Sequence, residues 1–315
     1  MKLVLGSMNF GPQVNEDEAK TMIQYFLKTG NNEIDTAYVY NEGQTETMLG
    51  EVLPEINKEE LRIATKIHPR ITGRLDKEAI ITQFSQSLER MKLNHIDILY
   101  FHFPDKETPI DDALKECTQL YEQGKIKELG LSNFPAWKVV DIWYRCDKNN
   151  WIKPTVYQGM YNSLCRNVEA ELFPALRQLG IRFYAYNPLA GGILSGKHKK
   201  FEESPMPGRF SRLQSYRNRY WKKNYFEALN VLLIACQQED IHPVDAAFRW
   251  LCNHSYLDKD KGDGVIIGAS SLAQLKQNIK SSAGTALSEN ILEAFDSAWD
   301  EAKPESPDYF QFFPK

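Results

Sequence analysis

The chain lacks the residue patterns of several large protein classes. Its cysteines are odd in number, widely spaced and without a Cys-x-x-Cys pair, which argues against a disulfide framework: Cys117, Cys146, Cys165, Cys236 and Cys252. No His-Glu-x-x-His or similar spacing occurs among the six histidines, so we expect no metal site. A net charge of −4 leaves no basic excess for nucleic acid. The apolar runs are too short for a membrane span or a secretory signal, so we expect a soluble, cytoplasmic protein.

What the chain does contain is an alternation of short apolar runs with helical patterns. The 315 residues suit one large α/β domain or two small ones, and we interpret residues 1–315 as a single barrel domain because the alternation runs almost throughout. Helical spacing occurs at Thr82–Arg90, Asp111–Gln123, Phe134–Lys148 and Leu272–Ser281. Strands are expected at Leu3–Gly6, Glu33–Asp35, Arg62–Lys66, Ile96–His102, Lys127–Ser132, Thr155–Tyr161, Arg182–Asn187 and Gly264–Gly268. Eight strands favour a closed parallel barrel, whereas fewer would form an open, doubly wound sheet.

Two segments interrupt this alternation. The stretch from Gly191 to about Asn224 is polar, basic and punctuated by glycine and proline, which predicts a long functional loop, such as a lid, after the seventh strand. The tail after Ala302 is rich in proline and aromatic residues, and we expect it to lie over the mouth of the barrel. Its aromatic residues are Tyr309, Phe310, Phe312 and Phe313.

Four side chains with complementary chemistry lie at or just after the ends of the second, third and fourth strands. Such ends meet on one face of a parallel barrel, so we expect Asp35, Tyr40, Lys66 and His102 to lie together. A nearby ammonium lowers the pKa of a phenol, and a carboxylate keeps that ammonium charged. With an imidazole that polarises a bound oxygen, the set forms a general acid for a carbonyl. It contains no hydride source, so a nicotinamide cofactor is implied.

Each of these four residues also has a simpler structural interpretation. Asp35 before Thr36 is typical of a helix cap, and Tyr40 could simply pack in the core. Lys66 could be a solvated strand end, and His102 lies between two phenylalanines as a core histidine would. Their positions at consecutive strand ends favour the shared site.

A dinucleotide would not be held by a Rossmann fold here. Residues 6–11 lack the Gly-x-Gly-x-x-Gly spacing. Residues 191–197 fit Gly-x4-Gly-Lys, but His198 replaces the Ser or Thr of a P-loop, so we interpret these glycines as a pyrophosphate cradle with charges from Lys197 and Arg209. After the last strand, Ser270 and Ser271 open a helix whose amides and hydroxyls suit a ribose 2′-phosphate, although an ordinary serine cap is the better explanation when the serines are taken alone.

Three other strand ends carry groups that suit a nicotinamide ring. Ser132, Asn133 and Gln158 can hydrogen-bond its carboxamide, and the ring of Tyr186 can stack on its plane. Taken singly, each could instead be a loop cap or a core residue.

Together these residues resemble the aldo-keto reductase family over essentially the whole chain. The matching residues are Asp35-Thr36-Ala37-x-x-Tyr40, Thr65-Lys66, His102, Leu131-Ser132-Asn133-Phe134, Gln158 and Tyr186-Asn187-Pro188-Leu189. Longer stretches at 154–162, 183–192 and 216–222 are similar to the branch of aflatoxin aldehyde and succinic semialdehyde reductases.

The resemblance implies a (β/α)8 TIM barrel that binds NADPH or NADP across its C-terminal face, with Tyr40 as proton donor supported by Lys66, Asp35 and His102. It also implies a homodimer, a small carbonyl substrate and a role in detoxification. The implied cofactor contacts are Asp35, Ser132, Asn133, Gln158, Tyr186, Asn187, Pro188, Leu189, Ala190, Gly191, Gly192, Lys197, Arg209, Ser270, Ser271, Gln274, Gln277 and Asn278. The implied substrate contacts are Met8, His102, Tyr216 and Arg219, the arginine through an anionic group.

The chain departs from that branch in three places. Gln311 stands where the branch has an arginine for an acidic substrate, which shifts the expected pocket toward less charged or aromatic aldehydes. The loop from Arg209 to Tyr216 looks shorter than in the branch. Gln274 replaces an arginine found in many members, so charge does not secure a preference for NADPH over NADH.

We therefore predict an NADP-dependent reductase of aldehydes, and of dicarbonyls and some ketones, that yields alcohols. Two alternatives stay open at this point. One is a nucleotide-binding auxiliary or sensor subunit with little turnover. The other is a barrel isomerase or lyase that needs no nicotinamide.

Overall fold

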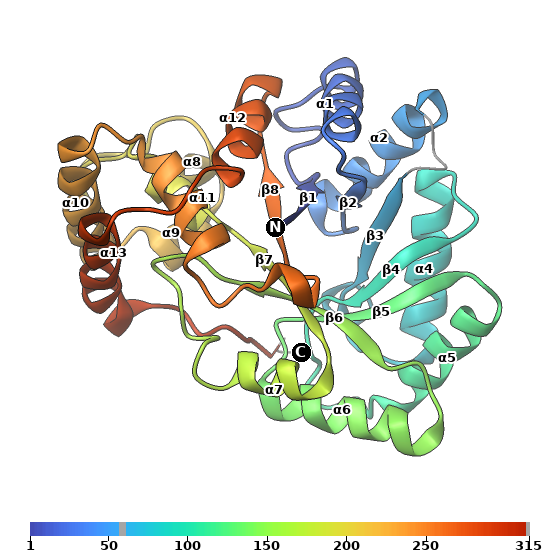
Figure 1. Ribbon diagram of the computed structural model, residues 1–315. Coiled ribbons are helices and arrows are strands. Elements are labelled where there is room, and N and C mark those ends of the chain that lie inside the picture. Colours follow the sequence, from blue (N-terminus) through green and yellow to red (C-terminus); the bar gives the residue numbers. More distant parts are fainter. Residues whose placement is uncertain (57–60, 313–315) are drawn as a thin grey trace.

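In the computed structural model, which describes residues 1–56 and 61–312, eight parallel strands close into a barrel in chain order (Figure 1). This confirms the TIM barrel expected from the sequence. The strands are β1 (Lys2–Gly6), β2 (Glu33–Asp35), β3 (Arg62–Ile67), β4 (Ile96–Phe101), β5 (Ile126–Ser132), β6 (Pro154–Met160), β7 (Arg182–Tyr186) and β8 (Gly264–Gly268). Pairing of β1 with β8, from Lys2 opposite Gly264 to Gly6 opposite Gly268, closes the barrel.

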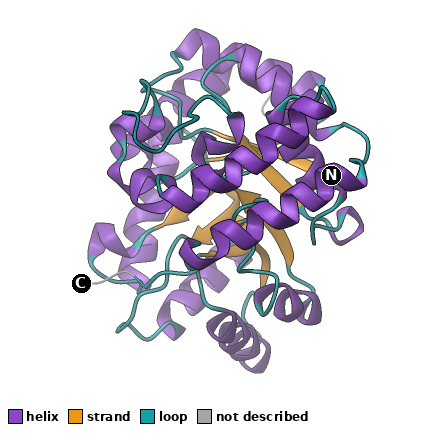
Figure 2. Ribbon diagram, turned by 90° about the vertical axis from the view of Figure 1, so that its left-hand side faces the viewer, coloured by secondary structure: helices purple, strands orange, loops and turns teal. Residues whose placement is uncertain are grey.

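Helices surround the strands as an outer layer (Figure 2). They bury apolar residues such as Met22, Ile23 and Phe26, which recur at helical spacing on one face of the first helix. The helices are α1 (Glu16–Lys28), α2 (Gln44–Val52), α3 (Pro69–Thr72), α4 (Lys77–Met91), α5 (Asp111–Glu122), α6 (Ala136–Asn149), α7 (Leu172–Leu179), α8 (Arg209–Arg212), α9 (Gln214–Tyr220), α10 (Lys223–Gln238), α11 (Pro243–Asn253), α12 (Leu272–Ser282) and α13 (Glu289–Ala302). None of the helices in residues 1–56 and 61–312 has the length and apolar character to cross a membrane.

The interior of the barrel is built in layers because side chains alternate along each strand. The middle layer is apolar and aromatic and contains Val4, Ala64, Ile98, Tyr100, Val156, Tyr184 and Ile266. Gly130 belongs to the same layer, and a Cβ atom there would lie 2.3 Å from the ring of Tyr100. This layer separates a charged layer at the N-terminal ends of the strands from a polar layer at their C-terminal ends.

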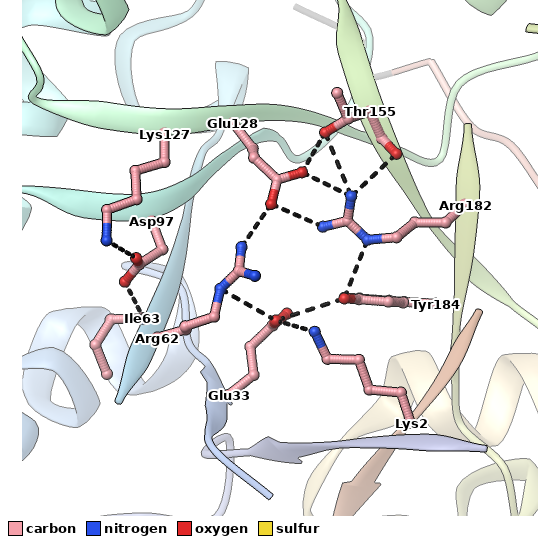
Figure 3. A network of polar contacts seen from close by, with 10 residues as sticks. All are labelled: Lys2, Glu33, Arg62, Ile63, Asp97, Lys127, Glu128, Thr155, Arg182 and Tyr184. Atoms are coloured by element: carbon pink, nitrogen blue, oxygen red, sulfur yellow. Dashed lines mark hydrogen bonds and ion pairs between the residues drawn. The ribbon is translucent and has the colours of Figure 1, made fainter. Parts of the chain in front are cut away.

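The charged layer is a network of ion pairs between neighbouring strands (Figure 3). Glu128 accepts hydrogen bonds from Arg62 at 2.5 Å and from Arg182 at 2.6 and 3.1 Å. Glu33 accepts from Lys2 at 2.6 Å. These groups close the end of the barrel opposite the predicted site, so their role is structural.

The structure corrects the expected loop from Gly191 to about Asn224. This stretch contains the end of the 3₁₀ helix η4 (Ala190–Ser195), then α8 and α9, and α10 begins at Lys223. Aromatic packing anchors it, because Phe210 lies with its ring centroid 5.3 Å from that of Trp221, whose indole N–H donates to the carbonyl of Phe201 at 3.0 Å.

The C-terminal tail reaches the C-terminal end of β5. The backbone N–H of Gln311 donates to the carbonyl of Asn133 at 3.3 Å, and the hydroxyl of Tyr309 accepts from the N–H of Ala136 at 3.0 Å. Phe312 packs on Trp137 with ring centroids 6.3 Å apart. The remaining aromatic residue of the predicted tail, Phe313, lies outside the described residues.

Candidate functional site

A buried lysine–aspartate pair lies at the centre of the polar layer. Asp35 ends β2 and Lys66 lies in β3, and the ammonium Nζ contacts both carboxylate oxygens at 2.7 Å. Lys66 also donates to the carbonyl of Thr36 at 2.7 Å. Burial lowers the pKa of Lys66 from its ordinary value, and the charge of Asp35 opposes that effect. Asp35 is therefore part of an ion pair and not a helix cap. The ammonium of Lys66 is fully buried, so Lys66 is not a solvated strand end.

Tyr40 begins the 3₁₀ helix η1 (Tyr40–Gly43) and brings its hydroxyl 3.5 Å from Nζ of Lys66. We expected this ammonium to lower the pKa of the phenol. Instead, burial and then the charge of Asp35 raise the pKa of Tyr40 well above 10.0. Lys66 makes its shortest contacts with Asp35 and Thr36 and does not offset the burial of the phenol, which therefore keeps its proton at pH 7.

His102 follows β4 directly, and its backbone N–H donates to the carbonyl of Ile67 at 2.9 Å. Its ring packs edge-on against Tyr40, with centroids 6.3 Å apart, and against His68 at 4.9 Å. Burial, followed by the charges of Lys66 and His68, lowers the pKa of His102 well below 6.5, so the ring is neutral at pH 7. Its Nδ1 is buried without a hydrogen-bond partner among the described residues.

The amide and aromatic side chains expected to face a nicotinamide ring form two hydrogen-bonded groups, one at Asp35 and one at His102. Gln158 donates to Asp35 at 2.8 Å, and Asn133 donates to the carbonyl of His102 at 2.9 Å. Tyr186 donates its hydroxyl to the side-chain oxygen of Asn133 at 2.7 Å. Asn133 directly follows β5, and Gln158 and Tyr186 lie on β6 and β7, so these contacts continue the polar layer around the barrel from Asp35 and Lys66.

The segment after β7 folds back over this layer. The hydroxyl of Tyr216 in α9 donates to Asn187 at 3.3 Å and lies 3.8 Å from the sulfur of Met8. The guanidinium groups of Arg209 and Arg219 lie 5.0 and 5.6 Å from the centroid of the Tyr216 ring. The expected substrate contacts Met8, Tyr216 and Arg219 therefore lie together, on the side of the site that α9 covers.

The turn from Asn187 to Gly196 has an unusual backbone, with five residues in the left-handed region. They are Asn187, Ala190, Gly191, Gly192 and Gly196, with φ between 48° and 119°. These residues close a series of tight turns, in which the N–H groups of Ala190, Gly192 and Gly196 donate to carbonyls of the same segment at 2.9, 2.8 and 3.1 Å. Within the expected cradle Pro188 and Ala190 are buried, whereas the side chain of Lys197 is exposed.

In the segment expected to bind the adenosine end of the cofactor, the structure shows the ordinary serine cap that was the simpler interpretation. Ser271 caps α12 by accepting from the N–H of Gln274 at 3.3 Å. The N–H and hydroxyl of Ser270 both donate to the side-chain oxygen of Gln274 at 2.9 Å. Asn278 is buried and donates to the carbonyl of Gly268 at 3.2 Å, whereas Gln277 is exposed.

Three further residues belong to this face although the sequence reasoning missed them. Asn9 accepts from Arg209 at 3.4 Å and donates to the carbonyl of Ala269 at 3.0 Å, which links the turn after β1 to the loop after β8. His68 packs on His102, and burial, followed by the charge of Arg70, lowers its pKa to about 4. Glu18 of α1 reaches the first turn of α12. The positions of Asn9 and His68 just after strands were a usable signal, whereas Glu18 lies on a helix and gave none.

The arrangement can donate a proton to a bound oxygen. A neutral phenol, a buried ammonium beside it and a neutral imidazole meet on one face, at strand ends where barrel enzymes carry their chemistry. Within residues 1–56 and 61–312, no group of three or more His, Cys, Asp or Glu side chains is arranged to hold a metal ion.

Comparison with known proteins agrees with this geometry. The model of the Aldo/keto reductase family matches residues 2–300. Aflatoxin B1 aldehyde reductase member 2 of Mus musculus is 42% identical over 320 residues, which cover 98% of this chain and 87% of the relative. Aldo-keto reductase family 7 member A3 of Homo sapiens is 42% identical over 320 residues, covering 98% and 96%. Aflatoxin B1 aldehyde reductase member 4 of Homo sapiens is 42% identical over 319 residues, covering 98% and 96%.

Proposed function

The chain belongs to the aldo/keto reductase family, and on this premise we propose that it reduces aldehydes, dicarbonyls and some ketones to alcohols with NADPH. The observation that carries the proposal is the buried contact of Lys66 with Asp35 at 2.7 Å and with the hydroxyl of Tyr40 at 3.5 Å. A phenol beside a buried ammonium is a proton donor that can support the charge left behind when the proton departs.

The side chains around this contact suit a nicotinamide dinucleotide. Ser132, Asn133 and Gln158 would hold the carboxamide, and Tyr186 would stack on the ring. The left-handed turn at 187–196, together with Arg209, would line the pyrophosphate. The segment 270–278 would take the adenosine end.

The chain's own residues account for the proton side of the reaction. Bound NADPH would supply a hydride from C4 of its nicotinamide. Burial raises the pKa of Tyr40, so the phenol keeps at neutral pH the proton that the carbonyl oxygen would receive. As that proton leaves, Lys66 stabilises the phenolate, and Asp35 holds the ammonium in place. His102 is neutral, so it orients the oxygen without supplying a competing acid.

The intact proton-donating set also bears on the sensor alternative. A nucleotide sensor needs only the binding residues, whereas the contact between the Tyr40 hydroxyl and the ammonium of Lys66 adds the proton donor that turnover requires. We therefore propose turnover as the principal function, with aldehydes of low charge or aromatic character as substrates, because the tail carries Phe310 and Phe312 and a neutral Gln311.

The test of this proposal is Tyr40→Phe, which removes one hydroxyl and leaves the ring. Steady-state oxidation of NADPH with a panel of small aldehydes should slow by about 10²- to 10⁴-fold, the usual contribution of a general acid. NADPH binding, followed by quenching of tryptophan fluorescence, should be unchanged. Tyr144→Phe, on the exposed side of α6, is the matched control and should keep wild-type turnover.

The possible outcomes separate the hypotheses. Normal turnover by Tyr40→Phe would refute the acid assignment. Binding of NADPH by the wild-type protein without turnover of any aldehyde would support the sensor, and absence of NADPH binding would favour a barrel enzyme that uses no nicotinamide.

A further inference from the structure

His68 lies directly after β3, and one side chain of α4 holds both of its backbone polar groups. The N–H of His68 donates to Oε1 of Gln83 at 2.9 Å, and its carbonyl accepts from Nε2 of Gln83 at 3.1 Å. Gln83 is buried, and α4 packs beside β3 (Figure 1). This paired contact fixes the backbone from which the ring of His68 projects, so the ring is a rigid part of the site.

The protonation of the His68 ring is fixed as well. Its Nδ1 accepts a hydrogen bond from the N–H of Arg70 at 3.0 Å, so this nitrogen carries a lone pair and no proton. Burial, followed by the charge of Arg70, lowers the pKa of His68 to about 4, so the ring is neutral at pH 7. A neutral imidazole has one ring proton, which must then lie on Nε2. His68 therefore presents a single N–H donor.

The ring of His102 lies next to this donor. Its Nδ1 is buried and has no hydrogen-bond partner among the described residues. The rings of His68, Phe103 and Tyr40 surround it, with centroids at 4.9, 5.2 and 6.3 Å. The ring of His68 is the nearest of the three, meets His102 edge-on at an interplanar angle of 67°, and alone carries an N–H.

The proposed reaction requires one particular form of His102. A neutral imidazole can orient a carbonyl oxygen as a donor only through the nitrogen that carries its proton, and Nε2 is the nitrogen left for a substrate because Nδ1 is buried. A neighbouring N–H favours a lone pair on Nδ1 and disfavours a second N–H there. We infer that His68 is a positioning residue for His102: its N–H edge keeps Nδ1 of His102 free of a proton, so that Nε2 carries the N–H that hydrogen-bonds the carbonyl oxygen. This inference rests on the proposed function.

His242 provides a matched control, because it caps a helix in the same way as His68. Each histidine precedes a proline that begins a helix, and Nδ1 of His242 accepts from the N–H of Val244 at 3.2 Å. His242 is exposed, and within the described residues it has no ring contact with His102. His242→Phe therefore removes an equivalent cap and leaves the rings of the site in place.

Two substitutions of His68 lose its N–H but differ in what else they remove. His68→Phe keeps a ring of similar shape and loses the cap. His68→Ser keeps an oxygen that can accept from the N–H of Arg70 and loses the ring. An effect common to both variants therefore follows from the N–H. If one of the two fails to fold, the other decides the result.

NMR of the NADP-saturated protein with isotope-labelled histidine measures the tautomer directly. The chain has six histidines, and loss of one set of signals in His102→Asn identifies those of His102. We expect the wild type and His242→Phe to show the form with the proton on Nε2. Both His68 variants should show a mixture of the two tautomers.

Single-turnover oxidation of bound NADPH by benzaldehyde measures the consequence. In both His68 variants the limiting rate should fall about tenfold, because the carbonyl is less well oriented, whereas the benzaldehyde concentration for half-maximal rate should change by less than about twofold. His242→Phe should react as the wild type does.

Three results would contradict these expectations in different ways. An unchanged tautomer or an unchanged limiting rate in the His68 variants would overturn the inference. Equal losses for His68→Phe and His242→Phe would assign the effect to capping and would overturn it as well. A wild-type protein that binds NADPH but oxidises it with no aldehyde would refute the proposed function, and with it any catalytic role of His68.

Discussion

Glu128 offers the most direct test of how the charged layer stabilises the barrel (Figure 3). Its side chain is 19% exposed and lies between the guanidinium groups of Arg62 and Arg182. Burial acts to raise the pKa of Glu128, but hydrogen bonds from Arg182, Thr155 and Arg62 lower it from 4.5 to about 2. A carboxyl group with a lowered pKa in the folded state binds protons more tightly in the unfolded chain, so ionisation of Glu128 stabilises the fold.

The magnitude follows from the two pKa values. A fall from 4.5 to about 2 corresponds to about 3 kcal/mol of unfolding free energy at pH 7, at about 1.36 kcal/mol for each tenfold change in acidity. This stabilisation is complete above about pH 5 and decreases as the pH falls from about 4.5 toward 2, and at pH 3 less than about half of it remains. Glu128→Gln should lose it at neutral pH and should approach the wild type in acid.

Urea denaturation at several pH values between 7 and 3, followed by circular dichroism, measures the difference. Glu51→Gln is the matched control, because Glu51 pairs with Lys92 at 2.8 Å but is 49% exposed, and an exposed pair adds little stability. If Glu128→Gln loses no more stability than Glu51→Gln at pH 7, or if its deficit is the same at pH 3 as at pH 7, the reasoning from the ion-pair network is wrong.

Two further predictions concern the site. Lys66→Met should lower the rate of NADPH oxidation by at least about 100-fold. It should also destabilise the protein by about 3 kcal/mol, because the buried carboxylate of Asp35 loses its counterion. Steady-state kinetics and thermal melting measure the two effects, and unchanged turnover would contradict the prediction. Gly191→Ala should weaken NADPH binding about tenfold, because φ is +70° and the new Cβ would lie 2.9 Å from two tyrosine rings of α9. Gly180→Ala has a similar φ of +67° in open space, so in fluorescence titrations it should bind NADPH as the wild type does, and equal losses for the two variants would count against the cradle.

Much of the site could be predicted from the sequence because strand side chains alternate. Once the strands are located, Asp35, Lys66, Gln158 and Tyr186 share the inward parity of Glu33, Ala64, Val156 and Tyr184 and must lie at the same end of the barrel. The same alternation locates the strand ends to within one residue. For example, β4 ends at Phe101, and His102 follows it. This alternation can be recognised in the sequence without knowing which distant elements contact one another.

The segment after β7 could not be predicted as well, because its order depends on tertiary contacts. Residues 197–222 are polar and interrupted by prolines, which is typical of a loop. The short helices α8 and α9 form there because Phe210 and Trp221 pack together, and because Tyr216 reaches Asn187 across the turn. Such pairings join residues whose spacing in the sequence carries no periodic signal.

The pKa of Tyr40 could not be predicted from the sequence, although the position of its side chain could. The sequence places a phenol, an ammonium and a carboxylate near one another, and from that we expected a phenol with a lowered pKa. The sign of the shift depends on burial and on the geometry of the charges: burial of the phenol, followed by the charge of Asp35, raises the pKa of Tyr40, and Lys66 lies 2.7 Å from Asp35 but 3.5 Å from the phenol. A phenol in that state holds its proton until an oxygen is present to receive it. The ammonium then matters for the phenolate that remains, so Lys66→Met should impair proton transfer more than it alters the resting state of Tyr40.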